Sequence, residues 1–256
     1  KDRQTQDVLI SSMIYNFIYN EIDKKDHPNA FYFNGKIELA GNIASVFNQK
    51  REDGGGVLRS PEHTIFGIPY AQFVKLDFDV RKYFKINGNH TLVLRQFVGL
   101  GIPYGNSSSM PFVRSYFNGG ANDIRAWVAF GGLGPGASQV DEKVRTYLMG
   151  NVKLTTNLEY RVPINDMYEG AIFTDIGNVW NTDNSGFDDQ FKFNKFIKEM
   201  GIGSGFGLRV NVAYITLRLD LAYKIYDPNK PDGEKWRFNQ FQPLKPTFNI
   251  AFGYPF

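Results

Sequence analysis

The sequence predicts an all-β fold, a transmembrane antiparallel β-barrel of which this chain supplies about nine strands. Three observations predict it: apolar and polar residues alternate over long segments, the connections alternate between short and long, and aromatic residues gather near the predicted strand ends. The 256 residues include 23 Phe, 14 Tyr and 3 Trp, yet mean hydropathy is only -0.34. No run approaches the ~20 consecutive apolar residues of a membrane helix, so a helical membrane protein is excluded.

Alternation at period two defines the strands, because successive side chains of a strand point to opposite faces of the sheet. The clearest case has Leu217, Leu219 and Leu221 on one face and Arg218 and Asp220 on the other. The first segment is apolar on both faces and alternates only weakly. In order, the predicted strands cover residues 7–20, 30–45, 70–84, 89–103, 151–162, 168–180, 201–212, 215–225 and 247–256.

The connections between these strands fall into two classes. Short ones lie at 21–29, 85–88, 163–167 and 211–214, and long ones lie at 46–69, 104–146, 181–200 and 227–245. Short turns on one side and long loops on the other are typical of outer-membrane barrels. A soluble β-sandwich would also alternate. The membrane barrel is favoured because the polar face carries charges of both signs and aromatic residues such as Tyr104, Tyr168 and Trp180 sit near strand ends, like interfacial girdles.

Strand parity adds a constraint on the domain. With nine antiparallel strands, the first and the last run in the same direction, whereas bacterial barrels close with an even number of antiparallel strands. We therefore expect residues 1–256 to be the C-terminal part of one barrel domain, with the first strands and any periplasmic domains absent from this sequence.

Searches for chemistry predict no enzyme, no cofactor and no metal site. The chain has no cysteine, and its three histidines (His27, His63 and His90) lack metal-ligand spacing. A net charge of +3 without a basic run predicts no nucleic-acid partner. The glycine-rich stretch 201–207 superficially suggests a nucleotide-binding loop, but its glycines alternate with apolar residues at strand period. We interpret them as small lumen-facing residues that make room for a loop.

The longest loop, 104–146, carries the most specific motif, and downstream strands carry two more. Phe117-Asn118-Gly119-Gly120 precedes Arg125-Ala126-Trp127 and then Gly134-Pro135. Together with Asn157-Leu158-Glu159-Tyr160 and with Phe173, Asp175, Gly177 and Trp180 of segment 173–180, this pattern resembles the BamA/TamA family of outer-membrane assembly barrels. The last strand, with Phe248, Ile250, Phe252, Gly253, Tyr254 and Phe256, resembles the family's C-terminal signal. The resemblance maps the chain onto roughly the last nine of the family's sixteen strands.

The resemblance implies that the long loop folds into the lumen and is latched there by Arg125 between Glu159 and Asp175. The residues fit this role, since a guanidinium makes charge-assisted and bidentate bonds to carboxylates that Lys does not reproduce. Gly119, Gly120 and Gly177 would allow tight turns and close approach. Ala126 departs from the family's usual Gly, which puts the local backbone freedom in question. The alternative is a solvated Arg125, with the acids paired instead to Lys153, Arg161 or Arg218.

The resemblance implies that the chain acts in insertion, assembly or translocation of proteins at the bacterial outer membrane. It implies that a weak seam of the barrel opens laterally and that the last strand forms one side of this seam. Its expected partners are outer-membrane lipid, nascent outer-membrane proteins, accessory envelope subunits, and the first barrel strands and periplasmic domains of the same chain. The alternatives are a passive or two-partner secretion pore and a structural subunit of an outer-membrane complex.

Overall fold

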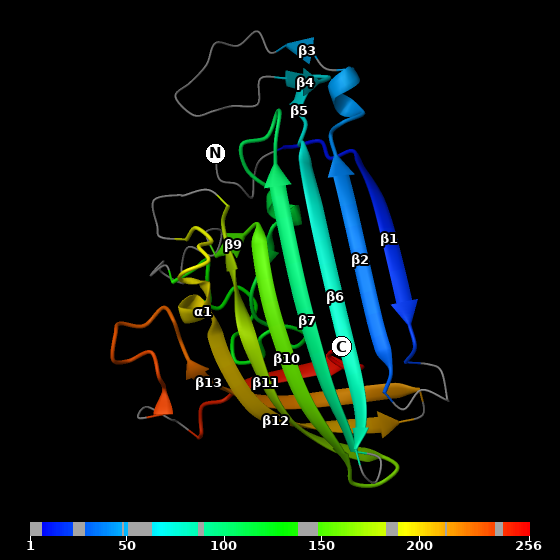
Figure 1. Ribbon diagram of the computed structural model, residues 1–256, viewed down its shortest axis with the longest axis vertical. Helices are drawn as coiled ribbons and strands as arrows, with labels where there is room; N and C mark the ends of the chain where they lie inside the picture. The colour runs from blue at the N-terminus through cyan, green and yellow to red at the C-terminus, as the bar shows by residue number, and fades with distance from the viewer. Residues whose placement is uncertain are drawn as a thin grey trace.

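The computed structural model describes residues 7–22, 29–47, 49–50, 63–86, 90–137, 148–182, 189–212, 214–238 and 243–256. One large sheet dominates it (Figure 1), in the order β1 (Ser12–Asn20), β2 (Phe31–Ala40), β6 (Phe73–Ile86), β7 (His90–Pro103), β10 (Val152–Pro163), β11 (Tyr168–Trp180), β12 (Gly201–Val212), β13 (Ile215–Tyr226) and β14 (Thr247–Phe252).

Short elements occupy the connections at the loop end of this sheet. They are η2 (Ala44–Val46), β3 (Gln49–Lys50), β4 (His63–Ile65), β5 (Ile68–Pro69), η4 (Phe112–Arg114), β8 (Tyr116–Phe117), β9 (Met149–Gly150) and α1 (Phe196–Glu199). β3, β4 and β5 form a small sheet, and β8 pairs with β9. Parts of the predicted connections, including 23–28, 87–88 and 138–146, lie outside the described residues.

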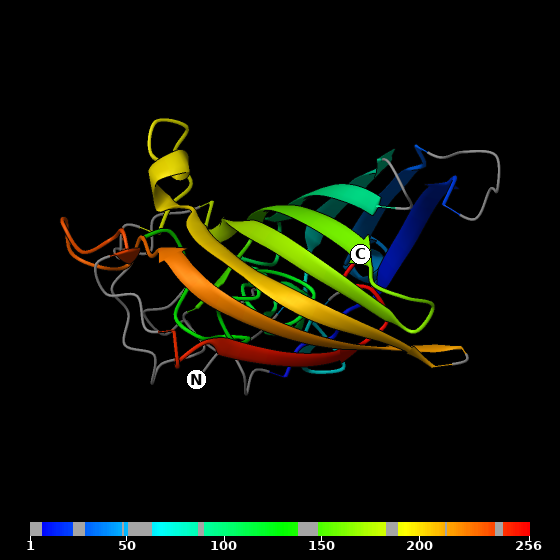
Figure 2. The ribbon, with the colours of Figure 1, turned by 90° about the horizontal axis from the view of Figure 1, so that it is seen from below.

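Every neighbouring pair in the large sheet is antiparallel, so the first and last of its nine strands point the same way. The sheet is strongly curved and stays open between β1 and β14, as Figures 1 and 2 show. The predicted parity is therefore confirmed: these strands form a curved wall rather than a closed barrel.

The two faces of the wall differ as the alternation predicts. On the convex face, Ile172 of β11 is 64% exposed and Ile250 of β14 is 60% exposed. On the concave face, Glu159, Arg218 and Asp220 are all fully buried. They are covered by residues 104–137, hereafter the inward loop, which lies within the concavity (Figure 2).

A small apolar core fixes the inward loop to the wall. Ile124, Ala126, Trp127 and Leu133 of the loop cluster with Phe173 of β11 and Ala222 of β13. This apolar patch is one dry contact of the loop with the wall, and Met110 of the loop makes a second with Ala40 of β2 and Phe73 of β6. Among the described residues, no helix is long and apolar enough to cross a membrane.

The predicted last strand, 247–256, is wrong beyond Phe252. β14 ends there, and Gly253 adopts φ of +75°, a conformation that glycine reaches without strain. The chain then leaves the sheet, and Phe256 is only 6% exposed, although the alternation placed it on the lipid face. Tyr254 likewise lies outside the strand. The predicted strands 7–20 and 30–45 are also too long, since β1 begins at Ser12 and β2 ends at Ala40.

The lipid face can be tested at Ile172, near the middle of β11. We expect Ile172→Arg to destabilise the folded protein in a bilayer by about 2–4 kcal/mol, because the guanidinium would face hydrocarbon. The measurement is urea unfolding in lipid vesicles, with Ile172→Leu as the matched control. Unchanged stability of Ile172→Arg would show that this face does not meet lipid.

Candidate functional site

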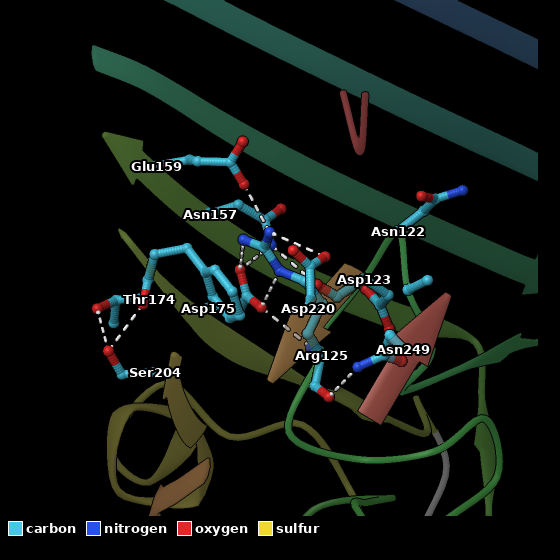
Figure 3. A network of polar contacts seen from close by, with 12 residues as sticks. Asn122, Asp123, Arg125, Asn157, Glu159, Thr174, Asp175, Ser204, Asp220 and Asn249 are labelled. Atoms are coloured by element: carbon cyan, nitrogen blue, oxygen red, sulfur yellow. Dashed lines mark hydrogen bonds and ion pairs between the residues drawn. The ribbon is translucent and has the colours of Figure 1, made fainter. Parts of the chain in front are cut away.

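Arg125 of the inward loop is fully buried and bound to Asp175 of β11 through three hydrogen bonds (Figure 3). Its Nε and Nη2 donate to the two carboxylate oxygens, both at 2.9 Å, and its backbone N–H donates to Oδ2 at 3.0 Å. Asn157 of β10 donates to the same carboxylate at 2.8 Å. The side chain and the backbone of Arg125 are therefore both fixed against one strand, in the bidentate geometry that a guanidinium favours.

The remaining amino group of Arg125 reaches Glu159 of β10. Nη1 donates to Oε2 at 2.5 Å and lies 3.7 Å from Oδ2 of Asp220 on β13. Glu159 is shared, since Arg209 and Arg161 approach it at 3.0 and 2.8 Å. The structure thus brings Arg125, Glu159 and Asp175 together. Glu159 also pairs with Arg161, one of the partners named in the alternative prediction.

Aromatic stacking completes the surroundings of the guanidinium. Its Cζ lies 3.4 Å from the ring centroid of Phe173. This cation–π contact is stronger in a site from which water is excluded. Burial disfavours the charged form, but the carboxylates of Asp175, Glu159 and Asp220 outweigh it and hold the pKa of Arg125 above its ordinary value. The group therefore stays a cation at all physiological pH values.

The wall leaves space for the residues that flank Arg125. Ala126 is fully buried against Gly203 of β12, where an added Cβ would collide with the Ala126 methyl group. Gly201 likewise leaves room for Leu133 and Trp127. Gly201 and Gly203 therefore make room for the loop as the sequence predicts, whereas Gly205 and Gly207 lie against Phe173 and Asp220 of the wall. Among the described non-glycine residues only two have positive φ, and Ala126 is not one of them, so it needs no conformation reserved for glycine.

The predicted motif glycines shape the loop and its contact with the wall. Gly119 and Gly120 have φ of +94° and +97°, and Gly119 N–H donates to Asp123 at 2.8 Å. At Gly177 an added Cβ would meet the backbone of β10, which accounts for the absence of a side chain there. Trp180, the last residue of β11, is fully buried and donates from Nε1 to Glu199 at 2.7 Å.

The inward loop also holds β14. Asn249 donates from Nδ2 to the carbonyl of Arg125 at 3.0 Å, and Thr247 donates from Oγ1 to the carbonyl of Ala126 at 2.9 Å. The Arg125 side chain thus contacts β10 and β11, and the backbone carbonyls of Arg125 and Ala126 contact β14. Neither residue was predicted as part of the site, although their lumen-facing parity beside Phe248 and Ile250 was a usable signal.

A second set of polar contacts ties the loop to the opposite half of the wall. Arg114 donates from Nε to Glu38 of β2 at 2.9 Å, and Lys75 of β6 donates to the Arg114 carbonyl at 3.0 Å. The Tyr116 hydroxyl donates to Asp77 of β6. Burial, followed by the charge of Asp77, raises the pKa of Tyr116. The loop therefore spans the concavity from β2 to β14.

These observations can be set beside known proteins. The Omp85 superfamily domain matches residues 1–242. This chain belongs to the Omp85 superfamily. Its fold is similar to that in the crystal structure of BamA from Haemophilus ducreyi lacking POTRA domains 1-3, with a TM-score of 0.52 and 14% sequence identity. The match covers 95% of this chain and 53% of that one, so the chain spans about half the length of that structure.

Membership of the Omp85 superfamily places the protein in the bacterial outer membrane, within a superfamily of assembly and translocation proteins. It also makes the convex face of the wall the lipid face and the concave face the barrel lumen. Among the described residues, no cluster of three His, Asp or Glu side chains could hold a metal ion.

Removal of the Arg125 side chain should release the loop while leaving the wall folded. In Arg125→Ala, Glu159 and Asp175 lose a buried partner, a loss that costs about 3–5 kcal/mol in buried pairs. We expect Arg125→Ala to reduce activity in cells more than it reduces the folded fraction of the protein. Arg125→Lys should restore only part of that activity, because Lys cannot bind a carboxylate bidentately. Growth complementation reports function, and a heat-modifiable gel shift reports folding. Complementation equal to wild type would overturn the latch.

The Arg114–Glu38 contact should contribute less, because the Arg114 side chain is 35% exposed whereas that of Glu38 is 2% exposed. A double-mutant cycle with Arg114→Ala and Glu38→Gln isolates the pair. We expect a coupling energy of about 0.2–1 kcal/mol in urea unfolding, typical of partly exposed pairs. Additive effects of the two substitutions would show that the pair does not support the loop.

Proposed function

We propose that this protein acts in the insertion, assembly or translocation of proteins at the outer membrane, by lateral opening of a barrel seam of which β14 forms one side. The observation that carries the proposal is the construction of β14. It has 6 residues against 12 in its neighbour β13, and its hydrogen bonds to the inward loop supplement this short ladder. A short strand secured from inside is easier to separate from a partner than a full-length one.

In this mechanism, the outer edge of β14 pairs with the first strand of the barrel, which we expect earlier in the same protein. Opening exposes unpaired N–H and C=O groups, and a strand of a nascent outer-membrane protein adds to that edge by β-augmentation. No covalent chemistry is required, so the role is not enzymatic. Periplasmic domains of the same protein and accessory envelope subunits would deliver such clients.

The latch of Arg125 has a defined part in this proposal. It fixes the loop against β10 and β11, the interior of the wall, while the loop carbonyls hold β14. The seam strand is thus tied through the loop to β10 and β11, the middle strands of the wall. A passive pore is less well supported, because the loop fills the concavity beside Glu159 and Asp220 and leaves both fully buried.

Photo-crosslinking distinguishes these roles. A photo-reactive phenylalanine in place of Ile250, which is 60% exposed on β14, should capture newly synthesised outer-membrane proteins in a pulse-chase experiment. The same residue in place of Leu158, 43% exposed in the middle of the wall on β10, serves as the control and should capture lipid alone. Absence of client adducts at Ile250, together with steady conductance of the purified protein, would instead support the pore.

A further inference from the structure

The segment 189–200, between β11 and β12, exposes two large apolar side chains at the loop end of the wall. Phe193 is 85% exposed and Ile197 is 71% exposed. The ring of Phe193 contacts those of Phe191 and Phe196, with centroids 5.1 and 6.5 Å apart. Contiguous exposed apolar side chains of this kind mark surfaces that meet a partner or a membrane.

This segment is rigidly mounted without help from the two exposed side chains. Glu199 accepts from Trp180 Nε1 at 2.7 Å through its carboxylate and from Asn178 Nδ2 at 2.5 Å through its carbonyl. The Phe191 ring packs edge-on against Trp180, with centroids 5.4 Å apart, and Phe191 N–H donates to the Asn181 carbonyl at 2.9 Å. Phe193 and Ile197 are therefore held out on a fixed support.

The support faces lipid rather than the lumen. In Figure 2, α1 stands on the convex side of the wall, opposite the inward loop. Trp180, on which Phe191 packs, is the last residue of β11, the strand whose Ile172 is 64% exposed on the convex face. A hydrogen bond of 2.9 Å from the Tyr226 hydroxyl to the Lys198 carbonyl also ties the segment to the end of β13. The exposed cluster thus continues the lipid face beyond the strand ends.

The residue composition of segment 189–200 is typical of chain that lies at the interface between lipid hydrocarbon and headgroups. Lys192, Lys195 and Lys198 are interleaved with the aromatic and aliphatic residues. At membrane interfaces, aromatic rings sit at the level of the headgroups, and lysine stems lie along apolar surface. Lipid is a better partner than protein because the segment adjoins a surface that already meets lipid.

We propose that segment 189–200 is an interfacial anchor that inserts Phe193 and Ile197 into the outer leaflet beside the barrel wall. The partner is membrane lipid, bound through its acyl chains near the headgroups. Such an anchor fixes the depth and tilt of the wall next to the seam half of the sheet, β12 to β14. The inference depends on the outer-membrane location and is independent of the proposed lateral opening.

The native chain has no cysteine, which allows a clean probe experiment. Phe193→Cys and Ile197→Cys, each labelled with an environment-sensitive nitrobenzoxadiazole dye in the whole protein in lipid nanodiscs, report the two positions separately. Asp232→Cys is the matched control, because the Asp232 side chain is 95% exposed on the next long loop. A heat-modifiable gel shift confirms folding of each variant before measurement.

We expect the dye at positions 193 and 197 to emit at shorter wavelength than at 232. Lipids carrying a doxyl quencher near the headgroup should quench it, and aqueous iodide should not. The control should show the reverse pattern. Iodide quenching at 193 and 197 equal to that at 232 would overturn the proposal, and would leave a partner protein as the occupant of this surface. If the dye at either position 193 or position 197 were quenched by iodide as strongly as at position 232, the anchor as proposed would also be rejected.

Discussion

The burial of one guanidinium constrains the rest of this structure. Taking a charge out of water costs several kcal/mol, and the cost is offset only by well-placed opposite charges and hydrogen bonds. Arg125 finds them in Asp175 and Glu159, on adjacent strands whose lumen-facing positions lie close together. The inward loop therefore enters the lumen to the depth at which Arg125 meets both carboxylates.

The neighbouring strands reflect that requirement. β12 presents glycines where the loop approaches, and Gly203 leaves the space that the Ala126 methyl group occupies. Here the family-like motif departs from Gly to Ala without strain, because a glycine on the facing strand accommodates the change. The loop then brings its own carbonyls to β14, so a loop positioned by charge becomes a support for the seam strand.

The sequence predicted the wall because two different solvents, lipid and a polar lumen, impose period two on every strand. It predicted the contacts of Arg125 through a motif resemblance and the known preference of guanidinium for paired carboxylates. It did not predict Arg114 with Glu38, since the two are 76 residues apart and neither lies in a recognisable motif. It was wrong about Phe256 because alternation of residue types continues after Gly253, whereas the backbone turns there and the strand ends.

That turn brings residues 253–256 to the polar contacts around Glu159. Arg161 pairs with Glu159 at 2.8 Å, donates to the Phe256 carbonyl at 3.4 Å and lies 4.5 Å from the ring of Tyr254. Glu159 in turn holds Arg125, whose carbonyl accepts from β14. The residues after β14 and the loop beneath it thus share one chain of charges. Glu159 therefore links the residues after β14 to the latch of Arg125, so the end of β14 and the inward loop depend on one shared carboxylate.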